Sequence, residues 1–223
     1  MEHILTCIIY ILATYMLGSF PTSAIIARLV GGLDLSKTGS GNLGATNVSR
    51  VIGKKYGIIT LAADALKGFI PVYIAFKYYK FFHFSFIMLS IIMIAPIIGH
   101  CYSIYIKFKG GKGVATALGV FAAVSPEAVL LALAIFIVML FLSRYVSLSS
   151  ITAAFFMPFL VFYSLRNMDF FIASCFISLL IVFKHIPNIT RLLNGTENKI
   201  NKKKTIVITI NSFFLCIPSA AKN

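Results

Sequence analysis

Long apolar runs separated by short polar loops constrain this chain more than any other feature of its sequence. The runs cover residues 4–26, 57–76, 84–98, 114–142, 151–165 and 170–183. A helix of about 20 apolar residues is long enough to cross a bilayer. Only 12% of the residues are charged, against about 25% in a soluble domain, which excludes an ordinary soluble globule, a coiled coil and a disordered chain. The sequence therefore predicts an all-α integral membrane protein, a polytopic helical bundle.

Most of the basic residues lie in three of the polar loops. These loops are residues 28–55, 99–113 and 184–204, and they hold fourteen of the twenty Lys and Arg residues. Cytoplasmic loops of membrane proteins carry such an excess, so we expect all three on the cytoplasmic side. This explanation of the positive charge requires no nucleic acid as a partner.

The number of helices follows from the placement of these loops. Because the second and third loops are expected on the same side of the membrane, an even number of spans must separate them. A single helix over 114–142 gives an odd number. Because proline disfavours helix at the residue before it and suits the first turn of a new helix, Pro126 is expected to split this run. We predict about seven transmembrane helices with the N-terminus outside. The alternative is five, which needs one helix over 144–183, twice the length of about 20 residues that suffices.

We expect one membrane domain, residues 1–204, followed by a C-terminal tail, 205–223, of unknown role. No Lys or Arg precedes the first apolar run, whereas a signal peptide begins with a cationic region, so we expect this helix to be retained. The four cysteines are dispersed, without metal-ligand or disulfide spacing. The sequence therefore predicts no metal site.

The first basic loop is rich in glycine and in hydrogen-bonding side chains over residues 37–50. Glycine permits left-handed backbone, so successive N–H groups can point into one concavity that binds an anion, with Ser40, Asn42, Thr46 and Asn47 beside it. The alternative is a flexible, solvated linker. Its Gly-x-Gly-x-x-Gly segment does not follow a buried strand, so we reject a dinucleotide-binding function.

The second basic loop places glycines and lysines directly before an apolar run, over residues 107–116. Backbone N–H groups, a helix N-terminus and a cationic side chain together can cradle a phosphate. The segment is not a Walker P-loop, because Ile106 stands where glycine is required and Lys112 is followed by glycine. The alternative is a basic flank that only sets the topology.

The third basic loop places Lys184, Asn188 and Arg191 at helical spacing, so that they can share one face. Its acid, Glu197, either belongs to the site or orders the surrounding cations through salt bridges. Within the second apolar run, Asp64 and Lys67 are i, i+3 partners. Because unpaired charges in lipid are costly, we expect these two to form a structural or site-lining pair.

These segments resemble a known family. The sequences at 39–50, 108–116 and 185–199 are similar to the three cytoplasmic signatures of the PlsY family of bacterial membrane acyl-phosphate:glycerol-3-phosphate acyltransferases. Shorter similarities lie at 18–21, 64–68 and 144–148, and the resemblance covers about residues 10–200. Ile186 departs from the arginine expected in the third signature.

The resemblance implies transfer of an acyl group from acyl phosphate to the sn-1 hydroxyl of glycerol 3-phosphate, which gives lysophosphatidic acid and phosphate in phospholipid biosynthesis. It implies a multi-pass protein of the bacterial inner membrane, with an active site facing the cytoplasm and without cofactors. The expected partners are glycerol 3-phosphate, acyl phosphate, membrane lipid and the soluble enzyme that makes acyl phosphate.

The resemblance also implies the site residues. The expected catalytic residues are Ser40, Arg50, His185, Asn188 and Glu197. The expected substrate- and phosphate-binding residues are Gly39, Gly41, Asn42, Gly44, Thr46, Asn47, Lys109, Gly110, Gly111, Lys112, Gly113, Thr116 and Arg191.

The sequence leaves the catalytic base open. The His-x4-Asp pair of other glycerolipid acyltransferases is absent, because Tyr105 and Thr190 stand at the aspartate positions after His100 and His185. A phosphate oxygen of the substrate or His185 could accept the proton, and a purely structural His185 is equally compatible. Alternative functions are a small transporter of anionic solutes and a CDP-alcohol phosphotransferase. The second needs clustered aspartates, and here the aspartates are scattered.

Overall fold

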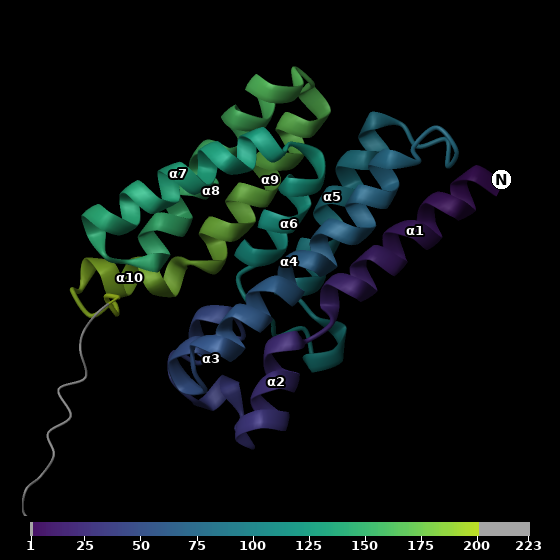
Figure 1. The fold of residues 1–223 in the computed structure, drawn as a ribbon. Coiled ribbons are helices and arrows are strands. Elements are labelled where there is room, and N and C mark those ends of the chain that lie inside the picture. Colours follow the sequence, from purple (N-terminus) through teal and green to yellow (C-terminus); the bar gives the residue numbers. More distant parts are fainter. Residues whose placement is uncertain (1, 201–223) are drawn as a thin grey trace, which may run out of the picture.

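The computed structural model describes residues 2–200, and every regular element within them is a helix (Figure 1). The 205–223 tail lies outside the described residues. The elements are α1 (Glu2–Ser19), α2 (Thr22–Gly31), η1 (Leu35–Lys37), α3 (Ala45–Val51), α4 (Lys54–Lys77), α5 (Phe86–Cys101), η2 (Ile104–Ile106), α6 (Val114–Val124), α7 (Pro126–Ser143), α8 (Val146–Leu165), α9 (Met168–Lys184) and α10 (Ile186–Leu193). The predicted all-α bundle is confirmed.

The seven apolar helices predicted from the sequence are α1 and α4 to α9. The single helix over 144–183 required by the five-span alternative does not form, because α8 ends at Leu165 and α9 begins at Met168. By length and hydropathy, five spans within residues 2–200 could cross a membrane when α1 and α2 are counted together. The number is six if α9 and α10, which meet at 53°, form one span. Helix α6 has 11 residues, about 16 Å of the roughly 30 Å hydrocarbon core. Seven complete crossings therefore stay a prediction.

The predicted break at Pro126 has a local cause. Pro126 opens α7, and the Ser125 hydroxyl accepts a hydrogen bond from the Ala128 N–H at 3.3 Å, as an N-cap does. At the other end of α7, Arg144 adopts a left-handed conformation with φ of 62°, which stops the helix and turns the chain into α8. The 114–142 run therefore forms two helices rather than one.

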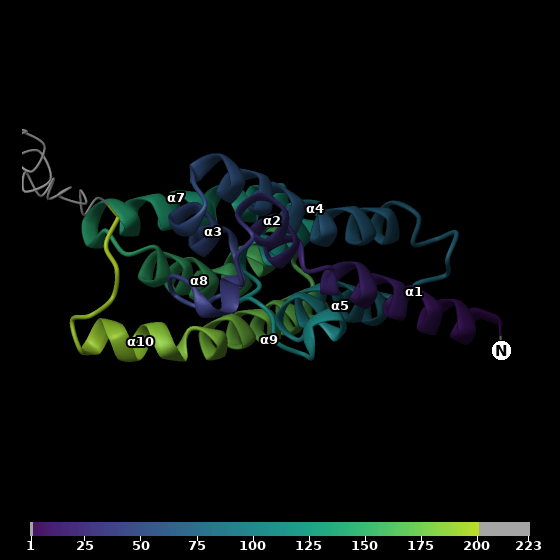
Figure 2. The same cartoon turned by 90° about the horizontal axis from the view of Figure 1, so that it is seen from below.

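All three basic loops gather at one end of the bundle, as the parity argument requires. Figure 1 shows α2, α3 and α10 at this end, with the N-terminus of α1 at the far end. Figure 2, which views the molecule from below, shows α2 and α3 in front of the long helices. This convergence brings segments more than a hundred residues apart into one site.

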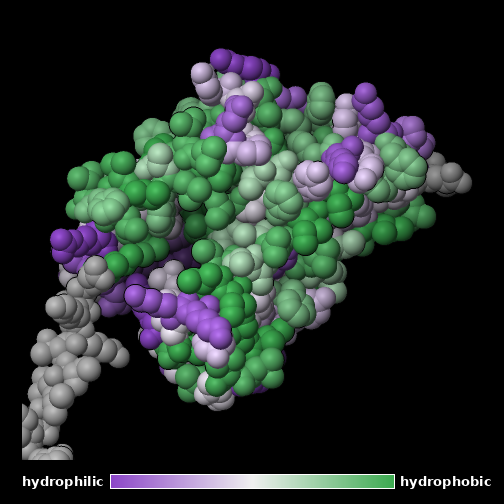
Figure 3. All heavy atoms as spheres, in the orientation of Figure 1, coloured by the Kyte–Doolittle hydropathy of each residue, from purple (hydrophilic) through white to green (hydrophobic). Residues whose placement is uncertain are grey.

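The outer surface of the bundle is largely apolar. In Figure 3 hydrophobic residues cover most of the visible face, and hydrophilic residues gather near the ends. Large side chains such as Leu130, Phe141 and Leu179 have exposed fractions of 67%, 81% and 71%. Exposed apolar surface of this extent is typical of contact with lipid.

Glycines let α1 approach α5 closely. A Cβ atom added to Gly18 would lie 2.3 Å from the Pro96 carbonyl oxygen, and one added to Gly99 would lie 2.3 Å from the Tyr15 carbonyl oxygen. Small residues at such crossings let two backbones pack together where lipid offers no hydrophobic driving force. The angle and spacing of α1 on α5 therefore depend on Gly18 and Gly99.

We predict that Gly99→Ala destabilises the protein, because its methyl group would meet α1 backbone atoms that cannot move without separating the helices. The expected cost is about 1–3 kcal/mol, seen as a lower thermal midpoint in detergent by fluorescence-detected size-exclusion chromatography. The matched control is Gly31→Ala in α2, where the nearest atom to an added Cβ is the flexible Leu33 side chain at 3.3 Å. Equal midpoints for the two variants would contradict this account of the α1–α5 contact.

Candidate active site

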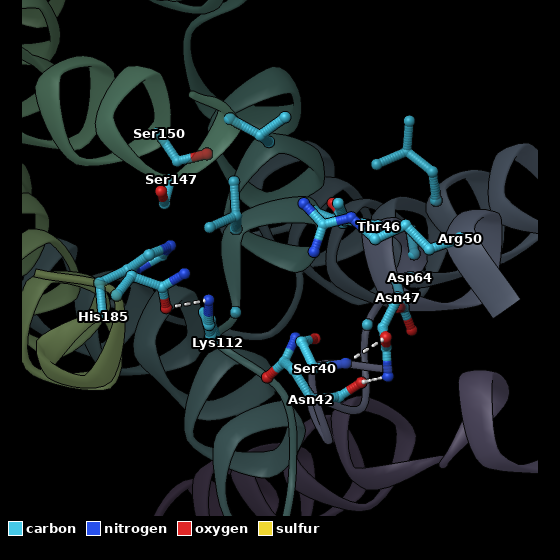
Figure 4. A pocket seen from close by; sticks show the side chains of 18 of the residues that line it. Ser40, Asn42, Thr46, Asn47, Arg50, Asp64, Lys112, Ser147, Ser150 and His185 are labelled. Atoms are coloured by element: carbon cyan, nitrogen blue, oxygen red, sulfur yellow. Dashed lines mark hydrogen bonds between the residues drawn. The ribbon is translucent and has the colours of Figure 1, made fainter. Parts of the chain in front are cut away.

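The three basic loops surround a polar cavity of about 180 Å³ at their end of the bundle (Figure 4). It is lined by Ser40, Asn42, Gly44, Ala45, Thr46, Asn47 and Arg50 of the first loop and α3, Leu61 and Asp64 of α4, His100 of α5, Lys112, Gly113, Val114 and Ala115 at the start of α6, Phe136 of α7, Val146, Ser147 and Ser150 of α8, and His185, Asn188 and Glu197 of the third loop. All five residues expected to be catalytic are therefore brought together.

Asn47 organises the first loop. Its amide nitrogen donates to the carbonyl oxygens of Thr38 and Asn42, both at 3.0 Å, and its amide oxygen accepts from the Ser40 N–H at 2.9 Å. The side chain is 1% exposed. Asn47 lines the cavity, but its hydrogen bonds fold the loop, so it holds Ser40 and Asn42 in place.

Arg50 projects from α3 over the cavity (Figure 4). Within residues 2–200 its guanidinium forms no salt bridge and no hydrogen bond. Thr46, one turn earlier on the same helix, also lines the cavity. An unpaired guanidinium beside a hydroxyl can bind a phosphate with two parallel N–H···O bonds.

Lys112 enters the cavity from the second loop and donates a hydrogen bond to Asn188 Oδ1. Burial lowers the pKa of Lys112 to about 8, although Glu197 opposes this shift; the nearby cations Arg191 and Arg50 add to it. A partly desolvated ammonium group is poised to pair with an incoming anion. Gly113, with φ of 80°, makes the left-handed turn that begins α6 and also lines the cavity.

Glu197 is the centre of the third loop, with a side chain 5% exposed. Its carboxylate accepts from Arg191 Nε at 2.7 Å, Asn188 Nδ2 at 2.8 Å and the Ser147 hydroxyl at 2.9 Å. Burial opposes ionisation, but these hydrogen bonds together hold the pKa of Glu197 below its usual value. The predicted ordering of cations by this acid is therefore seen with Arg191, and Glu197 lies in the cavity as well.

His185 lies at the bend between α9 and α10 and is 2% exposed. Its Nδ1 is 2.8 Å from the Ile181 carbonyl oxygen. A carbonyl only accepts, so Nδ1 carries the hydrogen, and in the neutral ring Nε2 is left as an acceptor. His185 is therefore oriented by the backbone of α9.

Several expected binding residues do not line the cavity: Gly39, Gly41, Lys109, Gly110, Gly111, Thr116 and Arg191. Close packing or a left-handed backbone explains why the glycines of this group are glycines. A Cβ on Gly110 would lie 2.0 Å from the His100 carbonyl oxygen, and one on Gly111 would lie 2.3 Å from His100 Nε2. Gly39 and Gly41 have φ of 63° and 70°. These residues do not line the cavity, so their direct contact with phosphate stays a prediction.

A buried polar cluster lies beneath the second loop. Asp64 and Lys67 form the predicted pair, with 2.9 Å between Oδ1 and Nζ. Thr116, expected to bind phosphate, is fully buried and hydrogen-bonded to His100 Nδ1 at 3.1 Å. Asp64 and His100 line the cavity. Sequence reasoning missed His100, because a single histidine at the end of an apolar run gives no signal.

An apolar groove of about 200 Å³ continues from the polar cavity between the helices. It is lined by Leu61, Val114, Ala115, Ala117, Leu118, Phe121, Ala132, Leu133, Phe136, Ser150, Ala153, Ala154, Met157, Ser178 and Ile181. Five of these residues also line the polar cavity, so the two spaces meet. Together they fit a ligand with an anionic head and an apolar chain.

Among residues 2–200, no three His, Cys, Asp or Glu side chains come together as metal ligands would. The absence of a metal from the reaction stays a prediction.

Comparisons with known proteins agree with this architecture. The family described as glycerol-3-phosphate acyltransferase matches residues 8–195. A protein of that name from Syntrophotalea carbinolica is 50% identical over 191 residues, covering 86% of this chain and 96% of that protein. One from Aquifex aeolicus is 42% identical over 189 residues, covering 85% and 96%.

Solved structures give the same result. The glycerol 3-phosphate form of PlsY (YgiH), an integral membrane glycerol 3-phosphate acyltransferase, matches with a TM-score of 0.82 and 39% identity over 93% of this chain and 98% of that chain. Its lysophosphatidic acid form matches with a TM-score of 0.79 and 41% identity over 87% and 95%. The chain therefore belongs to the PlsY family of membrane glycerol-3-phosphate acyltransferases.

Proposed function

We propose that this protein transfers an acyl group from acyl phosphate to the sn-1 hydroxyl of glycerol 3-phosphate, on the cytoplasmic face of a bacterial inner membrane. Family membership makes the chain a multi-pass glycerol-3-phosphate acyltransferase of phospholipid synthesis. It therefore argues against the alternative function, a transporter of anionic solutes. The identity of the donor, the orientation and the roles of the residues are the proposal.

One observation carries the proposed donor. The polar cavity, with Arg50 and Lys112 on its walls, opens into the apolar groove. Acyl phosphate has an anionic head and a long apolar chain, and this pair of spaces suits both parts. Arg50 and Lys112 supply charge-assisted hydrogen bonds to the two phosphates, and Ser40, Asn42 and Thr46 supply uncharged hydrogen-bonding groups beside them.

The protein does not need to activate the acyl group, since acyl phosphate is already an activated mixed anhydride. The sn-1 oxygen attacks the carbonyl carbon, the bond from that carbon to the phosphate oxygen breaks, and the hydroxyl proton passes to a phosphate oxygen. Holding the two reactants in contact and stabilising the developing charge then supply most of the rate enhancement. His185 Nε2 is the protein group that could instead accept the proton.

An assay of the donor tests this proposal. Purified protein with radiolabelled glycerol 3-phosphate should form lysophosphatidic acid from palmitoyl phosphate, with little or no product from palmitoyl-CoA. EDTA should leave the rate unchanged, because the described residues offer no metal cluster. Equal rates with the two donors would overturn the donor assignment, and loss of activity in EDTA would overturn the metal-free reaction.

Lys112 should make substrate binding depend on pH. Because the pKa of Lys112 is about 8 in the empty site, the ammonium group that attracts phosphate is lost as the pH rises through this value. The KM for glycerol 3-phosphate should rise about tenfold between pH 7 and pH 9, a range in which the phosphate, with its second pKa near 6, keeps its charge.

The control for this pH dependence is Lys112→Arg, whose guanidinium stays charged throughout the range. Its KM should be flat from pH 7 to pH 9, whatever its absolute value. A second control, Lys54→Ala with Lys55→Ala, removes exposed charges outside the cavity and should keep the wild-type profile. A wild-type KM that is flat, or a Lys112→Arg profile that still rises, would exclude Lys112 as the titrating group.

The proposed orientation can be tested by labelling with an impermeant thiol reagent in intact cells. Cysteines introduced as Lys37→Cys, Lys109→Cys and Asn194→Cys lie in the three basic loops and should be shielded from outside. Asn167→Cys, in the turn between α8 and α9, should react. Because the chain has native cysteines, the unmodified protein sets the background. Labelling of all three loops from outside would reverse the proposed topology.

A further inference from the structure

Ser150 lies where the polar cavity meets the apolar groove. The residues that line both spaces are Leu61, Val114, Ala115, Phe136 and Ser150. Four of these side chains have no polar atom. Among these five residues, the Ser150 hydroxyl is therefore the side-chain group at the boundary that can form a hydrogen bond. It projects from α8, and Figure 4 shows its oxygen pointing into the cavity.

The Ser150 hydroxyl is unused, unlike the hydroxyls of its neighbours on α8. Ser147 donates to Glu197 at 2.9 Å, Ser149 donates to the Tyr145 carbonyl at 2.8 Å, and Thr152 donates to the Leu148 carbonyl at 3.0 Å. The Ser150 hydroxyl makes no hydrogen bond with any residue from 2 to 200, and the residue is 6% exposed. The Ser150 oxygen is not fully enclosed by protein atoms, and its accessible part faces the cavity that Ser150 lines.

The position of this hydroxyl matches the expected position of the carbonyl oxygen of the acyl donor. This match rests on the proposed function. If the phosphate lies among Arg50 and Lys112 and the chain lies in the groove, the carbonyl group between them lies at the boundary between the two spaces. This carbonyl is the reacting centre. A free hydroxyl beside it can reach the carbonyl oxygen, which gains negative charge as the acceptor attacks.

We propose that Ser150 is a catalytic residue that donates a hydrogen bond to the carbonyl oxygen of the acyl donor. As the sn-1 oxygen bonds to the carbonyl carbon, the π electrons of the carbonyl move to its oxygen, and Ser150 stabilises this oxyanion while keeping its own proton. The electrons then return, the bond between the carbonyl carbon and the phosphate oxygen breaks, and the phosphate leaves with the proton of the sn-1 hydroxyl. A donor held in place before the reaction stabilises the transition state more than the ground state.

Kinetics of Ser150→Ala with palmitoyl phosphate tests this role. Removing one oxyanion donor lowers kcat about 100-fold or more in enzymes that depend on it, so we expect a loss of this order with KM for both substrates within about threefold. Ser150→Thr keeps the hydroxyl and should restore most of kcat. Ser150→Val has the shape of threonine without the hydroxyl and should not.

Ser149→Ala is the matched control. Ser149 directly precedes Ser150 on α8, is fully buried, donates its hydroxyl to the helix backbone and does not line either space. The kcat of this variant should therefore stay near the wild-type value. An unchanged kcat for Ser150→Ala, or equal rates for the Thr and Val variants, would overturn the oxyanion role. A rise in KM alone would show that Ser150 holds the substrate in its ground state. A wild-type protein without turnover of palmitoyl phosphate would instead overturn the proposed donor, so the two failures are distinct.

Discussion

The carboxylate of Glu197 joins parts of the chain that lie far apart in the sequence. It accepts hydrogen bonds from Ser147 of α8 and from Asn188 and Arg191 of α10, and Asn188 in turn accepts one from Lys112. A buried carboxylate is stable only when its oxygens are satisfied in this way. The relative placement of α8, α10 and the start of α6, and hence the shape of the cavity, depends on this acid.

Glycines of the second loop allow close contacts beside the same site. Gly111 packs against the His100 ring and against the Leu43 carbonyl oxygen of the first loop, each within 2.5 Å of where a Cβ would lie. The second loop therefore has to cross the end of α5 in close contact, which turns the Lys112 side chain toward the cavity. Glycines that suggested a phosphate cradle in the sequence serve to bring two loops together, and the cation beside them faces the ligand.

Features with a local cause could be predicted from the sequence. The helix break at Pro126, the Asp64–Lys67 pair and the convergence of three basic loops follow from proline geometry, i, i+3 spacing and charge distribution. His100, Ser147 and Ser150 could not be assigned to the site, because a polar residue in or beside an apolar run does not show what its side chain faces, although Ser147 lies in the 144–148 segment that resembles the family. Their place in the site depends on which helices pack together, and a single sequence does not show this.

The proposed division of the site has a physical reason at its boundary. Cations can lie in the cavity because Glu197, water and incoming phosphates share the cost of burying them. The groove is apolar, and a charged group at its mouth would lose hydration without gaining a permanent partner. A neutral hydroxyl costs far less to place there and still donates a hydrogen bond when negative charge forms. Ser150 is therefore the kind of residue that can serve a reaction taking place between a polar and an apolar space.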